Sequence, residues 1–434
     1  MTSLRFFNRC YWPDSEATGQ LLTELCEYLA QRWDVSAVVG QPNWETDRET
    51  FVRSGVQERN GVSVHRLLHT QLPKNKRFSR VRNLISFTLA TRSWGYRQTR
   101  PGYAISDDGP EALRASDETV ICETDPFLLP LVVGPMARRR KSRLVYYLQD
   151  IYPDVAVAVG VTKNNLLIRM LRNRLKREYN QADAIVVLDE DMKERLVGWG
   201  VAADLMHVVP NWMDCSAVKP IKSNNPFREE HGIDEHFIVM HSGNMGMTQR
   251  LDVLVDAMKI LAETCESKAN ENQPVGRSAK LMLVGNGAKR QALETQAGGA
   301  TNVRFLDYQP RESLSASLSA ADLHVVSMDQ AITGCLAPSK LYGILASGTP
   351  VLAIAPKDNA VWRLVQKEKL GWNVQPGDRK AIANAICEAK QMHPNELREI
   401  GLRCRALAER LYDKQICCEA FEKVLNRVGR RMRP

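Results

Sequence analysis

The stretch from Ala337 to Val351, APSKLYGILASGTPV, decides the fold predicted for this chain. A polar turn containing Pro338 and Lys340 leads into a short apolar helix, and a break of small residues leads into the strand 351–355. Unpaired backbone N–H groups and the positive end of the helix dipole favour phosphate at such a turn, and Lys340 adds a cation. Taken alone, the segment fits an ordinary helix start with a surface lysine better than a phosphate site. The other motifs of the chain are what favour the phosphate site.

Strands and helices alternate along the whole chain in the same way. Apolar runs predict strands at 4–7, 35–39, 62–67, 119–122, 144–148, 184–188 and 206–209 in the first half, and at 237–241, 281–284, 303–305, 323–326, 351–355 and 371–374 in the second. Helical periods separate many of them, which predicts parallel sheets covered by helices on both faces. The predicted fold class is α/β, with two doubly wound, Rossmann-like domains facing each other across a cleft.

A chain of 434 residues is too long for one ordinary core, so two domains are expected. The last strand of the first half ends near Pro210–Asp214. We therefore predict an N-terminal domain at 1–213 and a C-terminal domain at 214–407. A basic amphipathic helix at about 408–431 could cover either domain, and packing back on the first is the arrangement we favour.

The composition is that of a soluble globular protein, with 44% hydrophobic and 25% charged residues. No apolar run reaches the roughly 18–20 residues that a membrane-spanning helix needs, and the N-terminus becomes polar too quickly for a signal peptide. The ten cysteines include no Cys-x-x-Cys pair. This usage speaks against a disulfide or metal framework and favours a reducing cytoplasm.

Positive charge is concentrated in the first half of the chain. The formal net charge is +9, and no Asp or Glu occurs between Arg59 and Ser106. Basic and aromatic residues alternate over 74–100, and further basic clusters follow at 138–143 and 169–177. This pattern predicts contact with an anionic membrane surface. A merely solvated basic face is the alternative, and nucleic acid is not expected because no nucleic-acid module is recognisable.

Six short motifs follow one another in a recognisable order. They are YWPDSEATGQLLTEL at 11–25, YLQDIYPD at 147–154, PNW at 210–212, SGNMG at 242–246, VGNG at 284–287 and PSK at 338–340. Each is weak alone. In this order, over about residues 4–425, they make the chain resemble a retaining glycosyltransferase of family 4 with the GT-B fold, within the bacterial branch that builds surface polysaccharides.

The resemblance implies a diphosphate-binding loop at Gly243 and Asn244 in the second domain. Many relatives carry an arginine after this glycine and a lysine five positions later, and here Asn244 and Gln249 replace them. Arg250, Lys289 or Lys340 is expected to supply the missing cation, and we favour Lys340.

The resemblance also implies where the rest of the donor is held. Gly285, Asn286 and Gly287 end a strand where a side chain would block the base or ribose, although a plain turn fits these residues equally well. Tyr308 and Gln309 lie where relatives hold the base through backbone amides. The base would be uracil or a purine, and uracil is the commoner case.

Two glutamates that many relatives carry eight positions apart are absent, since Cys335 and Gly343 stand there. Ribose recognition must therefore differ from the common pattern. Gly334, Cys335 and Ser339 are expected to line the donor sugar or its phosphates instead, and Gly343 to let a ligand approach.

Asp150 is the carboxylate expected to act in transfer, because it closes the strand 144–148 and should point into the cleft. In retaining relatives the departing phosphate is thought to take the acceptor's proton, so Asp150 would orient the acceptor or donor rather than act as a strict base. A turn-forming or capping aspartate is the alternative, Asp154 is a weaker second choice, and Asp125 is interpreted as structural. Thr18 and Gly19 open the first helix, where the backbone can approach a ligand. The resemblance implies that they shape the acceptor side and reach the donor phosphates, and an ordinary strand-to-helix turn is the alternative.

No metal or other cofactor is expected. The nearest acidic motif, Asp189–Asp191, follows a strand and favours helix capping. The predicted function is transfer of a hexosyl or N-acetylhexosaminyl group from a UDP-sugar to a polyprenyl-diphosphate-linked acceptor for O-antigen, capsule or exopolysaccharide synthesis. The enzyme would work in the cytoplasm, at the inner face of the membrane.

Two other functions remain open at this point. A non-hydrolysing nucleotide-sugar 2-epimerase on the same scaffold is one, and a non-catalytic nucleotide-binding partner subunit is the other. A dehydrogenase is disfavoured because no Gly-x-Gly-x-x-Gly follows the first strand.

Overall fold

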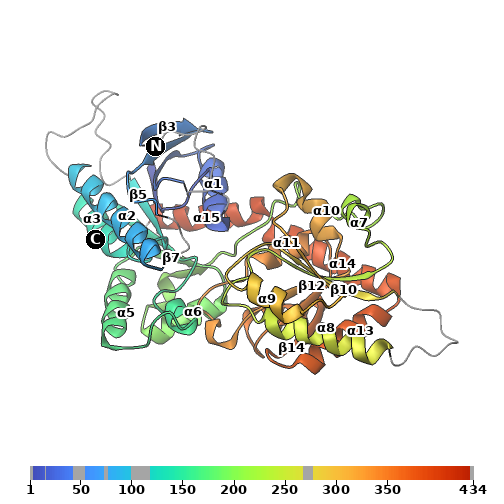
Figure 1. Ribbon diagram of the computed structural model, residues 1–434. Coiled ribbons are helices and arrows are strands. Elements are labelled where there is room, and N and C mark those ends of the chain that lie inside the picture. The colour runs from blue at the N-terminus through green and yellow to red at the C-terminus, as the bar shows by residue number, and fades with distance from the viewer. Residues whose placement is uncertain are drawn as a thin grey trace. The chain divides into compact units, whose positions relative to one another are not determined.

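The computed structural model describes residues 3–14, 16–42, 54–72, 77–98, 118–266 and 277–430 (Figure 1). The chain divides into two compact units. The first is built from Met1–Pro210, Gly334–Ala337 and Cys418–Pro434, and the second from Asn211–Thr333 and Pro338–Cys417. The division after Pro210 lies three residues before the predicted end at 213, and the first unit also contains the segment Gly334–Ala337, which the sequence placed in the second domain.

The first unit contains an eight-stranded sheet in the order β3-β4-β2-β1-β5-β6-β7-β8. Its strands are β1 (Ser3–Phe7), β2 (Asp34–Val39), β3 (Gly55–Arg59), β4 (Val62–Arg66), β5 (Glu118–Glu123), β6 (Arg143–Tyr147), β7 (Ala184–Val187) and β8 (Met206–Val208). All neighbours pair in parallel except β3 and β4. Every residue of the central β5 is buried, as expected for a strand covered on both faces.

Helices cover both faces of this sheet. They are α1 (Ala17–Leu29), α2 (Arg77–Gln98), α3 (Pro130–Arg140), α4 (Asp154–Ala158), α5 (Leu166–Tyr179), α6 (Glu190–Trp199), the short η2 (Ala203–Leu205) and, from Cys418 on, α15 (Lys414–Arg430). Successive side chains of β6 point to opposite faces. Tyr146 packs on Tyr179 of α5 with ring centroids 5.2 Å apart, whereas Tyr147 packs on Phe421 of α15 at 5.0 Å.

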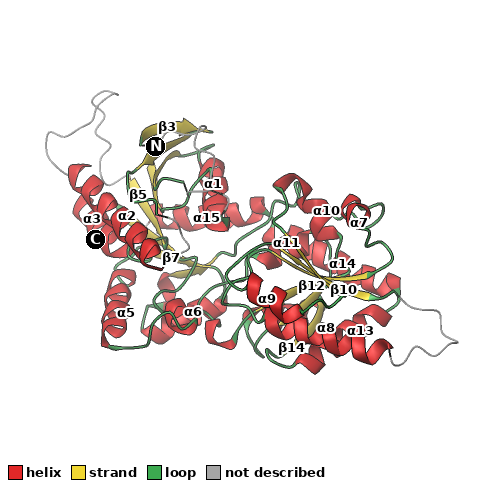
Figure 2. Cartoon of the chain, in the orientation of Figure 1, coloured by secondary structure: helices red, strands yellow, loops and turns green. Residues whose placement is uncertain are grey.

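The second unit contains a six-stranded parallel sheet in the order β11-β10-β9-β12-β13-β14 (Figure 2). Its strands are β9 (Phe237–Ser242), β10 (Ala279–Val284), β11 (Val303–Leu306), β12 (Leu323–Ser327), β13 (Val351–Ile354) and β14 (Gly371–Val374). Side chains of β9 and β10 alternate between two buried clusters. Val239 and Leu281 belong to one, and Met240 and Met282 to the other.

The second unit also contains helices, some of which contribute further residues to these two clusters. They are α7 (Pro226–His231), α8 (Leu251–Glu266), α9 (Arg290–Ala297), η3 (Arg311–Ser313), α10 (Leu314–Ser319), η4 (Gln330–Ile332), α11 (Lys340–Ala346), α12 (Ala360–Glu368), α13 (Arg379–Gln391), α14 (Pro394–Leu407) and η5 (Ala408–Tyr412). Both units are therefore doubly wound α/β sheets, which confirms the predicted fold class. Among the described residues, no helix is both long and apolar enough to cross a membrane.

One strand was missed, and one local prediction was wrong. The hairpin strand β3 was not predicted. The single helix expected at about 408–431 is instead interrupted, because η5 is a π-helical turn that ends at Tyr412 and α15 begins at Lys414. Only its part from Cys418 belongs to the first unit. There Glu422 accepts hydrogen bonds from Arg32 and Trp33.

Candidate functional site

Lys340 of the second unit lies against the turn that follows β9. A Cβ built on Gly243 would stand only 2.7 Å from Lys340 Cε, and Gly243 has a φ of +123°, which favours glycine. Burial lowers the pKa of Lys340 to about 8, and among the described residues no group forms a hydrogen bond or ion pair with its ammonium. Burial and the Lys340 charge together lower the pKa of His241 to about 3. Lys340 is thus a partly desolvated cation that lacks a counter-charge.

The other two candidate cations are already engaged. Arg250 binds both carboxylate oxygens of Asp252, at 3.0 Å from Nη2 to Oδ2, and lies 3.9 Å from Asp329. Lys289 donates from Nζ to the carbonyl oxygen of Gln249 at 2.6 Å. These contacts support the preference for Lys340.

The loops after β9, β10 and β11 meet at the carboxyl ends of the strands, where open α/β sheets bind ligands. Met245 donates its backbone N–H to the Asn286 carbonyl at 2.7 Å, and Tyr308 donates its hydroxyl to the same oxygen at 3.3 Å. Gln249 accepts the N–H of Gly246 at 3.0 Å, whereas the half-buried Gln309 donates to the Asp307 carbonyl at 3.2 Å. The sequence-predicted donor residues of these loops are therefore brought together.

The glycines after β10 allow these loops to pack on each other. A Cβ on Gly285 would stand 2.3 Å from the Gly243 carbonyl oxygen, and a Cβ on Gly287 would stand 2.6 Å from that of Met245. Both glycines also have positive φ. Loop-to-loop contact therefore explains both residues without a ligand, although the sequence had suggested that they make room for the nucleotide.

Asp150 of the first unit lines a cavity of about 400 Å³ together with Arg9, Thr18, Arg80 and Tyr152. Burial and then the neighbouring Asp125 raise the pKa of Asp150 to about 6. Its backbone forms a bridge to Leu336, but no described residue forms a hydrogen bond or ion pair with its carboxylate. It caps no helix, since α4 begins at Asp154 with Pro153 at its N-cap. The turn-forming and capping alternatives for Asp150 thus find no support.

Most of the other carboxylates near this cavity are paired or fully buried, and the exposed Glu16, which also lines it, accepts a hydrogen bond from the Cys10 thiol at 3.2 Å. Asp125 forms an ion pair with Arg9 at 2.9 Å, and Asp154 binds Arg172 at 2.6 Å and Arg195 at 2.9 Å. Burial raises the pKa of Glu123 well above its usual value. Among the described carboxylates that line the cavity, Asp150 is the one whose carboxylate forms no hydrogen bond or ion pair with another described residue.

Two models of known families match this chain and together span most of it. Residues 17–212 match a glycosyl transferase 4-like domain, and residues 236–391 match glycosyl transferases group 1. The chain belongs to glycosyltransferase family 4. A probable glycosyltransferase from Pseudomonas aeruginosa, WbjE, is 26% identical to it over 312 residues, which are 70% of this chain and 73% of WbjE.

Solved structures of low identity share the GT-B fold of this glycosyltransferase. Sucrose-phosphate synthase of Thermosynechococcus elongatus is 16% identical with a TM-score of 0.72, and 99% of each chain is covered. Anabaena HepE, solved in complex with UDP-glucose, is 16% identical with a TM-score of 0.68, and 98% of this chain and all of HepE are covered. WaaG, a lipopolysaccharide-biosynthesis glycosyltransferase, is 14% identical with a TM-score of 0.65 over 97% of this chain and 99% of its own.

The positions of the two missing family glutamates are both buried in this glycosyltransferase. A Cβ on Gly343 would contact Met213 Cε at 3.1 Å and Leu318 Cδ1 at 3.2 Å, so close packing, rather than the expected ligand approach, explains this glycine. Cys335 accepts the Ile151 N–H at 2.7 Å within the first unit. Gly334, also in the first unit, packs against the Asp191 carbonyl, while the exposed Ser339 makes no capping hydrogen bond.

The sequence interpretation missed several residues of the glycosyltransferase's first unit. Phe127 and Tyr152 stack with centroids 4.9 Å apart beside Asp150, and Arg9 reaches the same cavity from the end of β1. Thr18 lines this cavity, whereas Gly19 packs under the preceding loop, where a Cβ would stand 3.2 Å from the Tyr11 nitrogen. Asp189 caps α6 by accepting the Met192 N–H at 2.8 Å, which confirms the predicted capping role.

Proposed function

We propose that this glycosyltransferase moves a hexosyl or N-acetylhexosaminyl group, with retention, from a UDP-sugar to a polyprenyl-diphosphate-linked saccharide. The observation that carries the proposal is the unpaired, partly desolvated Lys340 beside the glycine turn of the second unit. A diphosphate supplies the negative charge that this ammonium lacks. The HepE structures that contain UDP and UDP-glucose support a uridine donor, and the lipopolysaccharide role of WaaG supports a surface-polysaccharide product.

The proposed reaction separates the roles of the two units. In the second unit, Lys340 stabilises the negative charge that develops on the departing diphosphate. The bond from the anomeric carbon to the phosphate oxygen breaks, the acceptor oxygen bonds to that carbon on the same face, and its proton passes to the departing phosphate. Asp150 of the first unit orients the acceptor hydroxyl. Because Lys340 neutralises the leaving group, we propose that no metal ion is needed.

A transfer assay tests this proposal. Radiolabelled UDP-sugars are incubated with the protein and bacterial lipid extract, with and without EDTA. We expect label in the organic phase from one donor, at equal rates in both conditions. Label that stays on an epimerised nucleotide sugar would indicate the epimerase instead, and millimolar UDP without measurable binding would indicate a non-catalytic subunit.

We also propose that the first unit docks on the inner face of the cytoplasmic membrane. On α2, the exposed apolar side chains are Phe78, Val81, Ile85, Leu89 and Tyr96, which are 44–73% exposed and share one helical face. Residues 74–76 and 99–100 of the predicted contact lie outside the described residues. On α5, Leu166 and Met170 lie along the helical face of Arg174, at 67% and 60% exposed.

These two helices belong to one surface. A groove of about 960 Å³ is lined by Leu89, Arg92 and Tyr96 of α2, by Arg139 and apolar residues of α3, and by Arg174 of α5. Apolar side chains flanked by arginines fit the boundary between acyl chains and anionic head groups, where each cation contributes about 1 kcal/mol.

Vesicle binding tests the membrane contact. The variant Ile85→Ser/Leu89→Ser/Arg92→Gln should bind vesicles containing phosphatidylglycerol at least about tenfold more weakly, because it removes two apolar anchors and one cation. Leu402→Ser, at a leucine 59% exposed on the second unit, is the control and should bind as the wild type does. Equal binding of the triple variant would contradict docking through this surface, and equal wild-type binding to neutral vesicles would contradict the preference for anionic lipid.

A further inference from the structure

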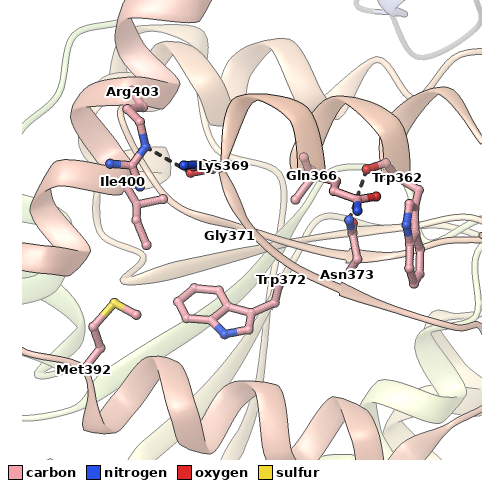
Figure 3. A pocket seen from close by; sticks show the side chains of 10 residues that line it. Trp362, Gln366, Lys369, Gly371, Trp372, Asn373, Met392, Ile400 and Arg403 are labelled. Atoms are coloured by element: carbon pink, nitrogen blue, oxygen red, sulfur yellow. Dashed lines mark hydrogen bonds between the residues drawn. The ribbon is translucent and has the colours of Figure 1, made fainter. Parts of the chain in front are cut away.

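A pocket of about 480 Å³ lies in the second unit at β14, the edge strand of its sheet (Figure 3). Its walls come from α12, from β14 and from α14. The residues that line it include Trp362, Lys369, Trp372, Asn373 and Arg403. The loops that carry the donor residues follow β9, β10 and β11, whereas β14 ends the opposite side of the sheet. The proposed transfer reaction uses none of the pocket residues.

Two tryptophans are held in place around this pocket. Trp372 packs in part against the buried cluster of the second unit, and its indole N–H donates to Glu388 Oε2 at 3.2 Å. In Figure 3, Trp372 lies between Met392 and Asn373, and Trp362 borders the side of Asn373. The Trp362 carbonyl accepts a hydrogen bond from Asn373 Nδ2 at 3.0 Å. The indole of Trp372 is therefore positioned before any ligand binds, and Trp362 is held through its backbone.

Several polar groups of the pocket could form further hydrogen bonds or ion pairs. Among the described residues, no donor reaches the buried Oδ1 of Asn373. Arg403 donates from Nε to the Lys369 carbonyl at 3.1 Å, which satisfies the end of α12. No described carboxylate forms an ion pair with the guanidinium of Arg403 or the ammonium of Lys369, although both side chains are exposed. The rim of the pocket is thus positive, and its walls are aromatic.

We propose that this pocket binds a pyranose ring that carries a carboxylate, as in a uronic acid residue of a glycan. The C–H face of the ring packs on an indole, its hydroxyls meet the amide of Asn373, and its carboxylate pairs with Arg403 or Lys369. The volume lies in the range of about 300–1,000 Å³ of small-molecule sites, which combine apolar walls with a few polar groups. An acidic glycan held here would be bound independently of the donor.

Calorimetric titration with sodium glucuronate, with glucose as the neutral match, tests the proposal. We expect saturable glucuronate binding that is at least about fivefold tighter than glucose binding. Lys369→Asn should weaken glucuronate binding at least about fivefold, because asparagine removes the cation yet tolerates the positive φ of +54° at this position. Trp362→Ala should abolish the binding. Lys367→Asn, on the same helix but not in the pocket wall, is the control and should bind as the wild type does.

The titration is repeated with saturating UDP and with Lys340→Met. Unchanged glucuronate binding in both cases would place the acidic sugar away from the donor site, whether or not the proposed transfer reaction is correct. No saturable glucuronate binding, equal binding of glucose, or displacement of glucuronate by UDP would each overturn the proposal.

Discussion

Replacing Lys340 with alanine or methionine is expected to weaken UDP binding by about 1.5–3 kcal/mol, or roughly 10- to 150-fold, because a charge-assisted contact to the diphosphate is lost. Isothermal calorimetry measures the change. Burial depresses the pKa of Lys340 to about 8, so below that pH the buried ammonium lowers the stability of the folded state. Lys340→Met should therefore unfold no more easily than the wild type at pH 7, which separates a binding defect from a folding defect.

Lys222→Met is the matched control for Lys340→Met. Burial also lowers the pKa of Lys222 to about 8, and Lys222 lies in the same unit. Its ammonium, however, donates to Thr349 Oγ1 at 2.7 Å and to the carbonyls of Ser319 and Ala321. UDP affinity should stay within about twofold of the wild type in Lys222→Met. Unchanged affinity in Lys340→Met would remove Lys340 from the donor site.

The same contact predicts a pH dependence for the binding of UDP. The free protein loses the Lys340 proton as the pH rises through about 8, and binding then requires that a proton be taken up again. Affinity should therefore fall above pH 8, by up to about tenfold per pH unit. A similar decline in Lys340→Met would assign the effect to another group.

Most strands could be predicted because buried parallel strands are continuous apolar runs. The strand β3 escaped because GVQER is polar and its residues are mostly exposed. The sequence does hold one signal for it. Asn60 and Gly61, with φ of 47° and 80°, form the two-residue turn between β3 and β4, and Asn-Gly is the strongest short hairpin signal.

Site residues could be predicted from the sequence only where a single local motif contains the functional group. Lys340 follows from the turn at 337–340. Of the two partners of Arg250, Asp252 is its near neighbour in the sequence, whereas Asp329 is distant and could not be inferred from the local pattern. The cavity at Asp150 is likewise built from α1, α2 and the loops after β1, β5 and β6, which are distant in sequence. The sequence left open whether Gly285 makes room for the nucleotide or forms a plain turn, because its neighbour, the Gly243 carbonyl, lies on another strand's loop.

Asp150→Asn is expected to lower kcat by about 10²-fold while making the fold more stable. The catalytic loss follows because an amide cannot orient the acceptor hydroxyl as the carboxylate does. The stability gain follows from the pKa of about 6, which burial and Asp125 raise above the usual 3.8. The folded state then binds more protons than the unfolded state between these values, so stability falls as the pH rises through 6.

Denaturant unfolding of Asp150→Asn should consequently show a gain of about 1–2 kcal/mol at pH 8 and little difference near pH 4, where Asp150 is protonated in the fold. The acidic limb of the wild-type rate profile near pH 6 should also vanish. Asp154→Asn should behave oppositely and lose stability, because Asp154 pairs with Arg172 and Arg195. A fully active Asp150→Asn variant would show that Asp150 does not orient the acceptor hydroxyl. A variant destabilised as Asp154→Asn is would show that Asp150 supports the structure instead.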